Sequence, residues 1–136
     1  MNAVHFEELI ERIVEKDPRY TRDAYLFLRE ALDYTQKRFV KKGEVRHVNG
    51  KELLDGVREY ALAQYGPMAM MVLDACGIRA TDDIGEIVFN MVEFNVLAKT
   101  EEDSLEDFKD VYDFAEAFKK PFEPSIKTSP EVKPVV

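Results

Sequence analysis

The sequence holds one cysteine, Cys76, and nothing else in its 136 residues suggests a cross-linked protein. A single thiol cannot form an intrachain disulfide, so we predict a protein of a reducing compartment. A chain of this length buries roughly two thirds of the surface it exposes when unfolded, which is enough for a core without disulfides or a structural metal. Because apolar residues surround Cys76, we expect its thiol to be buried and unreactive.

Long apolar runs are also missing. No stretch of the sequence reaches the roughly 18 consecutive apolar residues that a membrane-spanning helix needs. The segment from Met1 to Glu8 lacks the basic start and apolar core of a secretory signal. We therefore expect a cytoplasmic protein with no membrane partner.

Familiar catalytic motifs are absent. The sequence has no glycine-rich phosphate loop, no nucleophile elbow, no His-Glu-x-x-His and no Cys-x-x-Cys pair. Glu44-Val45-Arg46-His47 has the Glu-x-x-His spacing of carboxylate-bridged metal sites, but it occurs once and in a loop. The acidic run from Glu101 to Asp110 lacks the alternating ligands and central glycine of a calcium-binding loop. The sequence thus predicts no catalytic residue, no cofactor and no metal site.

Basic residues are scarce in the second half of the chain. The net charge of −8 divides into +1 over residues 1–50, −4 over 51–100, −5 over 101–120 and 0 beyond. No lysine or arginine lies between Ile84 and Ala98. A nucleic-acid-binding surface concentrates these residues, because phosphate contacts supply most of its affinity. The second half is therefore a poor candidate for such a surface.

Helical periodicity is the strongest positive signal. Apolar side chains recur every three or four residues over 6–14, 22–40, 53–65 and 84–92, the spacing of one buried helix face. Asn49 and Glu52 have the capping-box spacing that starts a helix near Gly50, and Asn95 can adopt a left-handed cap. The segment from Pro67 to Cys76 is apolar on almost every side, which predicts the central and most buried helix. Its methionines are interpreted as core filling, with an adaptable binding groove as the alternative.

Residues 96–114 are compatible with two structures. The preferred prediction is a small β-hairpin with strands at 96–99 and 108–114, followed by one helical turn that Asp113 caps. The alternative is a helix capped by Ser104, since apolar residues at 105, 108, 111, 112 and 115 also have helical spacing. Residues 121–136 contain four of the six prolines and are expected to form a disordered tail.

The predicted architecture is mainly α: a single domain over 1–120 with five helices. It comprises a helical hairpin over 1–42 and a winged-helix-like part over 49–120. In a DNA-binding winged helix the helix starting at Thr81 would enter the major groove, but here its outward side chains are acidic and would repel phosphates. We expect this face to be a solvated exterior or to bind a basic protein. The candidate interaction surface consists of Asp82, Asp83, Glu86, Asn90, Glu93, Glu101, Glu102 and Asp103.

Basic residues gather near the end of the second predicted helix. Cations there complement the negative end of the helix dipole, so a solvated helix end is one interpretation and an anion-binding site the other. The candidate anion-binding patch consists of Lys37, Arg38, Lys41, Lys42 and Arg46.

Five strings of residues carry a family resemblance. They are DPRY at 17–20, ALDYT at 31–35, GPMA at 66–69, TDDIGEIVFN at 81–90 and KTEEDS at 99–104. Over about residues 5–122 the chain resembles a family of short, conserved but uncharacterised bacterial proteins. The resemblance implies a bacterial cytoplasmic origin and transfers no catalytic residue. Asn95 departs from the glycine that the family pattern leads us to expect.

Together these features predict a non-catalytic protein-interaction or regulatory module with a protein partner. Two alternatives stay open. One is nucleic-acid binding through residues 37–46, and the other is a metal protein or enzyme that uses carboxylates such as Asp82, Glu86, Glu101 and Asp103.

Overall fold

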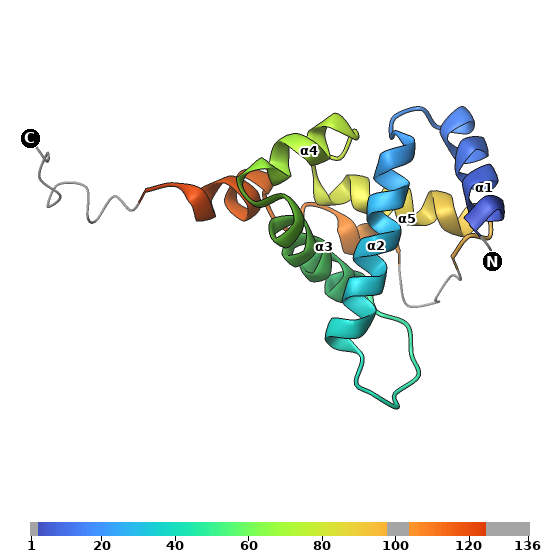
Figure 1. The fold of residues 1–136 in the computed structure, drawn as a ribbon, viewed down its shortest axis with the longest axis horizontal. Helices are drawn as coiled ribbons and strands as arrows, with labels where there is room; N and C mark the ends of the chain where they lie inside the picture. The colour runs from blue at the N-terminus through green and yellow to red at the C-terminus, as the bar shows by residue number, and fades with distance from the viewer. Residues whose placement is uncertain (1–2, 98–103, 125–136) are drawn as a thin grey trace, which may run out of the picture.

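The computed structural model describes residues 3–97 and 104–124 (Figure 1). Five α-helices occur there: α1 (Ala3–Lys16), α2 (Arg22–Phe39), α3 (Gly50–Tyr65), α4 (Ala69–Ala75) and α5 (Thr81–Glu93). Short helical turns complete the fold: η1 (Gly66–Met68), η2 (Leu105–Phe108), η3 (Ala115–Lys119) and η4 (Lys120–Phe122). The prediction of a mainly helical domain with five helices is confirmed.

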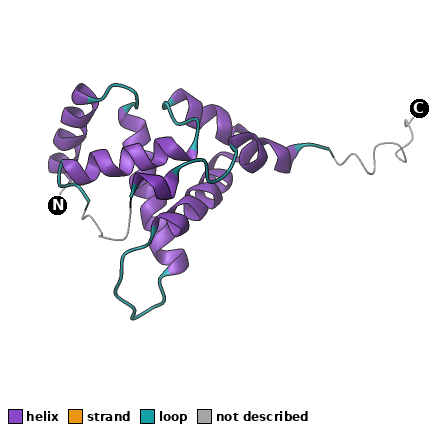
Figure 2. Ribbon diagram, turned by 180° about the vertical axis from the view of Figure 1, so that it is seen from behind, coloured by secondary structure: helices purple, strands orange, loops and turns teal. Residues whose placement is uncertain are grey.

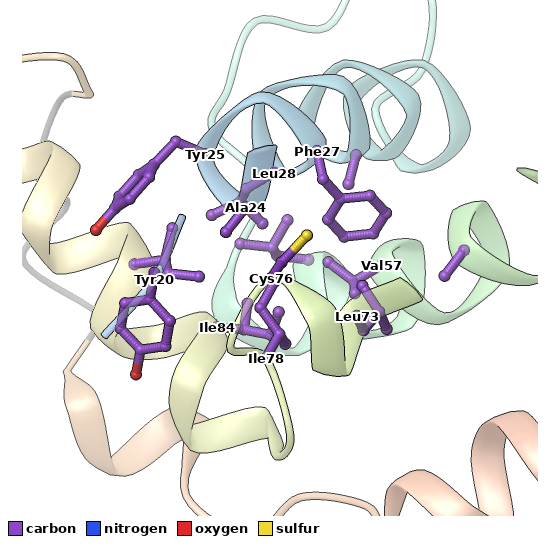
Figure 3. Packing of buried hydrophobic residues seen from close by; sticks show 14 of the residues in the cluster. Tyr20, Ala24, Tyr25, Phe27, Leu28, Val57, Leu73, Cys76, Ile78 and Ile84 are labelled. Carbon is purple, nitrogen blue, oxygen red and sulfur yellow. The ribbon is translucent and has the colours of Figure 1, made fainter. Parts of the chain in front are cut away.

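The core lies between α2, α3 and α5, and α1 and α4 add buried side chains at its edges. α2 packs most extensively against α3, and the chain reverses direction between α1 and α2 (Figure 1). Side chains from α2, α3, α4 and α5 converge on one cluster, as Figure 3 shows. Those fully removed from solvent include Leu28, Val57, Leu73 and Ile84.

The helix ends follow local sequence signals. At the start of α3, Glu52 N donates to Asn49 Oδ1 (2.8 Å) and Asn49 N donates to Glu52 Oε1 (3.0 Å), which is the predicted capping box. Asn95 has a φ of 60°, the left-handed conformation expected after α5. Asp113 Oδ2 accepts a hydrogen bond from Glu116 N (3.1 Å), as predicted for the turn that follows.

The prediction that the fourth helix is the most buried element is wrong. α4 is short and lies at the edge of the core, where only Ala69 and Leu73 of its residues are buried. Met70 and Met71 are 38% and 64% exposed. Side chains of α2, α3 and α5 already fill the centre of the core. The apolar side chains of α4 that do not face this core therefore lie at the surface, on the side of η3.

The β-hairpin prediction is also wrong where the chain is described: residues 3–97 and 104–124 contain no strand (Figure 2). Side chains of α5 bind the backbone that a partner strand would have paired. Thr81 Oγ1 donates to Phe108 O (2.7 Å) and accepts from Val111 N (3.0 Å), while Asp82 Oδ1 accepts from Asp110 N (2.9 Å). Asp110 has a φ of 46°, which interrupts any extended run.

Because the described residues contain no strand, the winged-helix-like arrangement is not supported there. The continuous helix considered as the alternative is not formed either: η2 and η3 occur in its place, joined by a bent link. The earlier half of the predicted hairpin includes residues 98–103, which lie outside the described part. The predicted tail is described only as far as Pro124.

No helix within the described ranges is both long and apolar enough to span a membrane.

Candidate functional site

The polar residues predicted to form an outward face on α5 are instead bonded within the molecule. Asp83 Oδ1 accepts from the Tyr20 hydroxyl (2.6 Å), and its Oδ2 accepts from the backbone N–H groups of Arg79 (2.8 Å) and Ala80 (3.1 Å). Glu86 Oε2 accepts from Arg19 Nη2 (3.1 Å). Asp83 therefore caps the start of α5 and ties it to the turn before α2.

Asn90 and Asp17 complete this link between α5 and the α1–α2 turn. Asn90 Nδ2 donates to Asp17 Oδ2 (2.9 Å) and to the Tyr25 hydroxyl (3.0 Å). Arg19 makes two hydrogen bonds to the Asp17 carboxylate, from Nε (2.9 Å) and Nη2 (2.8 Å). Bidentate pairing of this kind strengthens the contact and defines its geometry.

The pKa values of the groups in this network shift in the direction that their contacts require. The Arg19 guanidinium, aided by Asn90, holds the pKa of Asp17 well below its usual range although burial opposes the shift. Asp17 in turn raises the pKa of Arg19. Burial, and then the bond to Asp83, raises the pKa of Tyr20. These groups stay in fixed ionisation states at neutral pH, as structural groups do.

The remaining members of the predicted interaction surface are divided. Asp82 binds Asp110 N, and Glu93 forms an ion pair with Lys16. Glu101, Glu102 and Asp103 lie outside the described residues. The five described members thus share one helix, but each has an intramolecular partner that reduces its availability for another protein.

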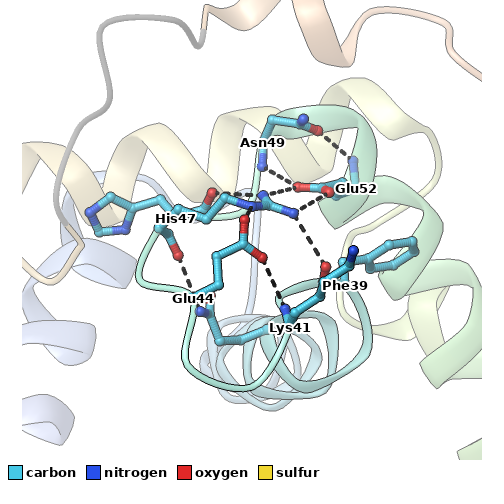
Figure 4. Close-up of polar contacts among 8 residues, drawn as sticks. Phe39, Lys41, Glu44, His47, Asn49 and Glu52 are labelled. Carbon is cyan, nitrogen blue, oxygen red and sulfur yellow. Dashed lines mark hydrogen bonds and ion pairs between the residues drawn. The ribbon is translucent and has the colours of Figure 1, made fainter.

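The predicted basic patch divides too, because Arg46 is bonded to Glu44, Glu52 and Phe39, the residues labelled around this loop in Figure 4. Arg46 Nη1 and Nη2 donate to the two carboxylate oxygens of Glu52 (2.8 and 2.9 Å), and Nη2 also donates to Phe39 O (3.2 Å). Its Nε donates to Glu44 Oε2 (3.0 Å). Glu52, which raises the pKa of Arg46 most, also belongs to the capping box of α3. Arg46 therefore joins the end of α2 to the start of α3.

Lys41 and Lys42 are the available cations of this patch. Lys37 pairs with Asp33 (3.0 Å) and Arg38 with Glu59 (3.2 Å). The side chains of Lys41 and Lys42 are exposed and form no ion pair with any side chain that the structure describes.

The described residues contain no group of three or more His, Cys, Asp or Glu side chains arranged to hold a metal ion. In the Glu44–His47 segment, the Glu44 carboxylate accepts from Arg46 Nε and from Lys41 N (3.0 Å). Glu44 thus serves a loop contact.

The structure contains a hollow of about 540 Å³ between α4 and η3. The sequence did not predict this hollow as the principal site. Figure 1 shows the orange-red segment that contains η3 lying beside α4. We call this hollow the α4 groove. Its apolar lining consists of Pro67, Met70, Met71, Ile78, Phe114 and Phe118.

The two walls of the α4 groove differ in character. On one side, Met70 and Met71 are exposed, and methionine side chains adapt readily to different apolar surfaces. On the other, Phe114 and Phe118 are buried and pack edge to face, with ring centroids 5.0 Å apart and planes at 85°. The groove therefore combines an adaptable wall with a rigid one.

Part of this site was visible in the sequence. For the methionines of the Met-Ala-Met-Met run at 68–71, an adaptable binding groove is the alternative interpretation to core filling. Phe114 and Phe118 have the i, i+4 spacing of one helical face, but nothing local indicates that this face packs beside α4.

Comparison with known proteins finds no matching family model, curated protein or solved structure.

Proposed function

We propose that this protein is a non-catalytic protein-interaction module that binds a segment of its partner in the α4 groove. The observation that carries the proposal is the exposure of Met68, Met70 and Met71, at 50%, 38% and 64%, beside the hollow that Met70 and Met71 line. Exposed apolar side chains that gather at a hollow release water when a partner covers them, which favours binding. Anchors in a concave apolar site also supply most of the binding energy of an interface.

The contacts of α5 support the same choice of site. Asp83, Glu86 and Asn90 hold α5 to the α1–α2 turn, so a partner would have to compete with existing bonds there. At the α4 groove, by contrast, apolar side chains lose only water on binding.

A pull-down with two matched variants tests the proposal. Met71→Gln removes an exposed apolar side chain from the groove, and Val45→Gln does the same in the distant 40–49 loop, where Val45 is 97% exposed. We expect a protein recovered from native lysate with wild-type and V45Q protein, in the presence of nuclease, and at least tenfold less of it with M71Q. Equal recovery by all three proteins would refute binding in the groove.

Nucleic-acid binding through residues 37–46 is the second candidate. It is favoured by the exposed side chains of Lys41 and Lys42, which form no ion pair within the described part of the chain. Such binding depends on phosphate contacts and weakens steeply with salt. It predicts that Lys41→Glu/Lys42→Glu abolishes retention of single- or double-stranded DNA or RNA at low salt, whereas M71Q has no effect. Retention that is insensitive to salt and to the lysine changes would rule this candidate out.

We also propose that the chain belongs to the short bacterial family that its motif strings resemble, and that it acts in the cytoplasm. Two of those strings, 17–20 and 81–90, meet through the Asp17–Asn90 and Tyr20–Asp83 hydrogen bonds. A shared structural role of this kind gives a physical reason for both strings to persist together.

A further inference from the structure

Three charged residues lie at the α4 groove, and their balance is positive although the protein as a whole is acidic. Asp74, Arg79 and Lys119 complete its lining. Arg79 Nε donates to Asp74 Oδ1 (2.6 Å), so these two charges largely offset each other. Lys119 is exposed and forms no ion pair with any residue in the described ranges. The groove thus carries one uncompensated positive charge, on a chain whose net charge is −8.

The Asp74–Arg79 pair leaves part of the guanidinium unused. Its contact to Asp74 runs through Nε alone, and both side chains are well exposed, at 59% and 68%. A guanidinium offers five N–H donors in a planar fork, so Arg79 retains donors for a second carboxylate. Both cations of the groove can therefore meet an acidic ligand.

From this arrangement we propose that the occupant of the α4 groove is an acidic amphipathic peptide segment of the partner protein. Its apolar side chains contact the exposed Pro67, Met70 and Met71, and its carboxylates lie against Lys119 and Arg79. This inference rests on the proposed function and adds the chemistry of the partner. It reverses the expectation from the sequence that the partner is basic.

Electrostatics at an apolar surface make the sign of the partner matter. When a peptide covers the groove, water is displaced around Lys119 and the effective dielectric constant falls, which strengthens both attraction and repulsion. A carboxylate compensates the lysine charge, whereas a second cation is repelled and loses hydration as well. The groove should therefore discriminate between peptides of equal hydrophobicity and opposite charge.

Three fluorescent helical peptides test this inference on the full chain. They share leucine and phenylalanine at one face with i, i+3, i+4 and i+7 spacing, and they carry Glu, Gln or Lys at the flanking positions. Fluorescence anisotropy at 50 and 200 mM salt measures their affinities. We expect the Glu peptide to bind about tenfold or more tightly than the Lys peptide, with the difference shrinking at the higher salt.

Paired charge reversals locate the effect. Arg79→Glu/Lys119→Glu should reverse the order of the Glu and Lys peptides. Lys41→Glu/Lys42→Glu makes the same change in net charge away from the groove and should preserve the order. Met71→Gln should weaken the binding of all three peptides.

The outcomes that overturn the inference separate it from the proposed function. Equal or tighter binding of the Lys peptide, still weakened by M71Q, would leave the groove as an interaction site and refute the acidic partner. Absence of binding by every peptide, or binding that M71Q does not change, would refute both. A competition experiment adds a synthetic peptide of residues 125–136 to the bound fluorescent Glu peptide. If this peptide displaces the Glu peptide at the same or a lower concentration than unlabelled Glu peptide does, the occupant is the chain's own C-terminal segment and the acidic partner segment is refuted.

Discussion

Gly56 of α3 lies directly against Thr35 of α2, so closely that a Cβ added to Gly56 would be 1.8 Å from Thr35 Oγ1. Thr35 is fully buried, and its hydroxyl donates to Ala31 O (2.6 Å), which leaves it no room to move aside. Since α2 and α3 form the most extensive helix pair, this contact sets how closely the centre of the core can pack.

We therefore expect Gly56→Ala to lower the free energy of unfolding by about 3 kcal/mol, although alanine is the better helix former. Urea unfolding monitored by circular dichroism measures the change. Thr35→Gly in the same chain should recover part of the loss, because it removes the clashing side chain. Equal stability of G56A and wild type would show that the two helices can separate without cost.

The Asp17–Arg19–Asn90 network makes stability depend on pH. Asp17 has a lower pKa in the folded protein than the value of about 3.9 expected in the unfolded chain. The stabilisation that ionised Asp17 provides is complete at pH values above the pKa of the unfolded chain. It is lost as pH falls below about 4, because the unfolded chain then takes up the proton before the folded protein does.

Asp17→Asn should cost about 1–3 kcal/mol at pH 7 and flatten the loss of stability between pH 4 and pH 2. Urea midpoints across this range provide the measurement. Asp33→Asn is the matched control, since the Asp33–Lys37 pair is exposed on both sides and contributes little. A D17N curve parallel to that of wild type would contradict the role assigned to Asp17.

The hydrogen bonds of Arg46, and not simply its positive charge, should keep the 40–49 loop ordered. Arg46→Lys keeps the charge but cannot reproduce the two parallel bonds to Glu52 or the bond to Phe39 O. We expect faster amide hydrogen exchange over residues 40–49, because the contacts that order the loop are lost. Lys42→Met removes an exposed charge that has no ion-pair partner among the described residues, and it should leave the exchange rates unchanged.

Cys76 should react slowly with thiol reagents in the folded protein. Its side chain is buried, and burial raises the pKa of the thiol above its ordinary value, so little thiolate is present at pH 7–8. Labelling by a chromogenic disulfide should be at least about tenfold slower than in urea-unfolded protein. A folded-state rate equal to the unfolded one would indicate that α4 opens readily, in conflict with the packing of Leu73 and Ile78 around it.

Local signals predicted the helices well, because periodicity, caps and breakers act over a few residues. α2 ends at Phe39, one residue before the predicted end, and the capping box at Asn49 occurs as expected. The predicted burial of Cys76 is confirmed. The same signals could not rank the helices by depth: α4 has apolar residues on all sides, which is compatible both with a central position and with a position beside η3.

The candidate sites were predicted less well, since charge in a sequence does not reveal which charges are already paired. Arg46 and Lys42 look alike in a basic run, yet Arg46 is bound to Glu44 and Glu52, while Lys42 pairs with no residue in the ranges 3–97 and 104–124. Asp83 and Asn90 look like an outward face of α5, yet they bind Tyr20 and Asp17 from more than 60 positions away.

For this protein the sequence alone determined the helices, their ends, the single domain and the acidic balance, because each depends on near neighbours or on composition. Only the tertiary structure decided that the backbone at 108–111 binds side chains of α5 instead of forming a strand. It also decided that Met70 and Met71 meet Phe114 and Phe118 at a groove with a net positive rim. These features depend on which buried faces meet, and that follows from packing the whole core at once.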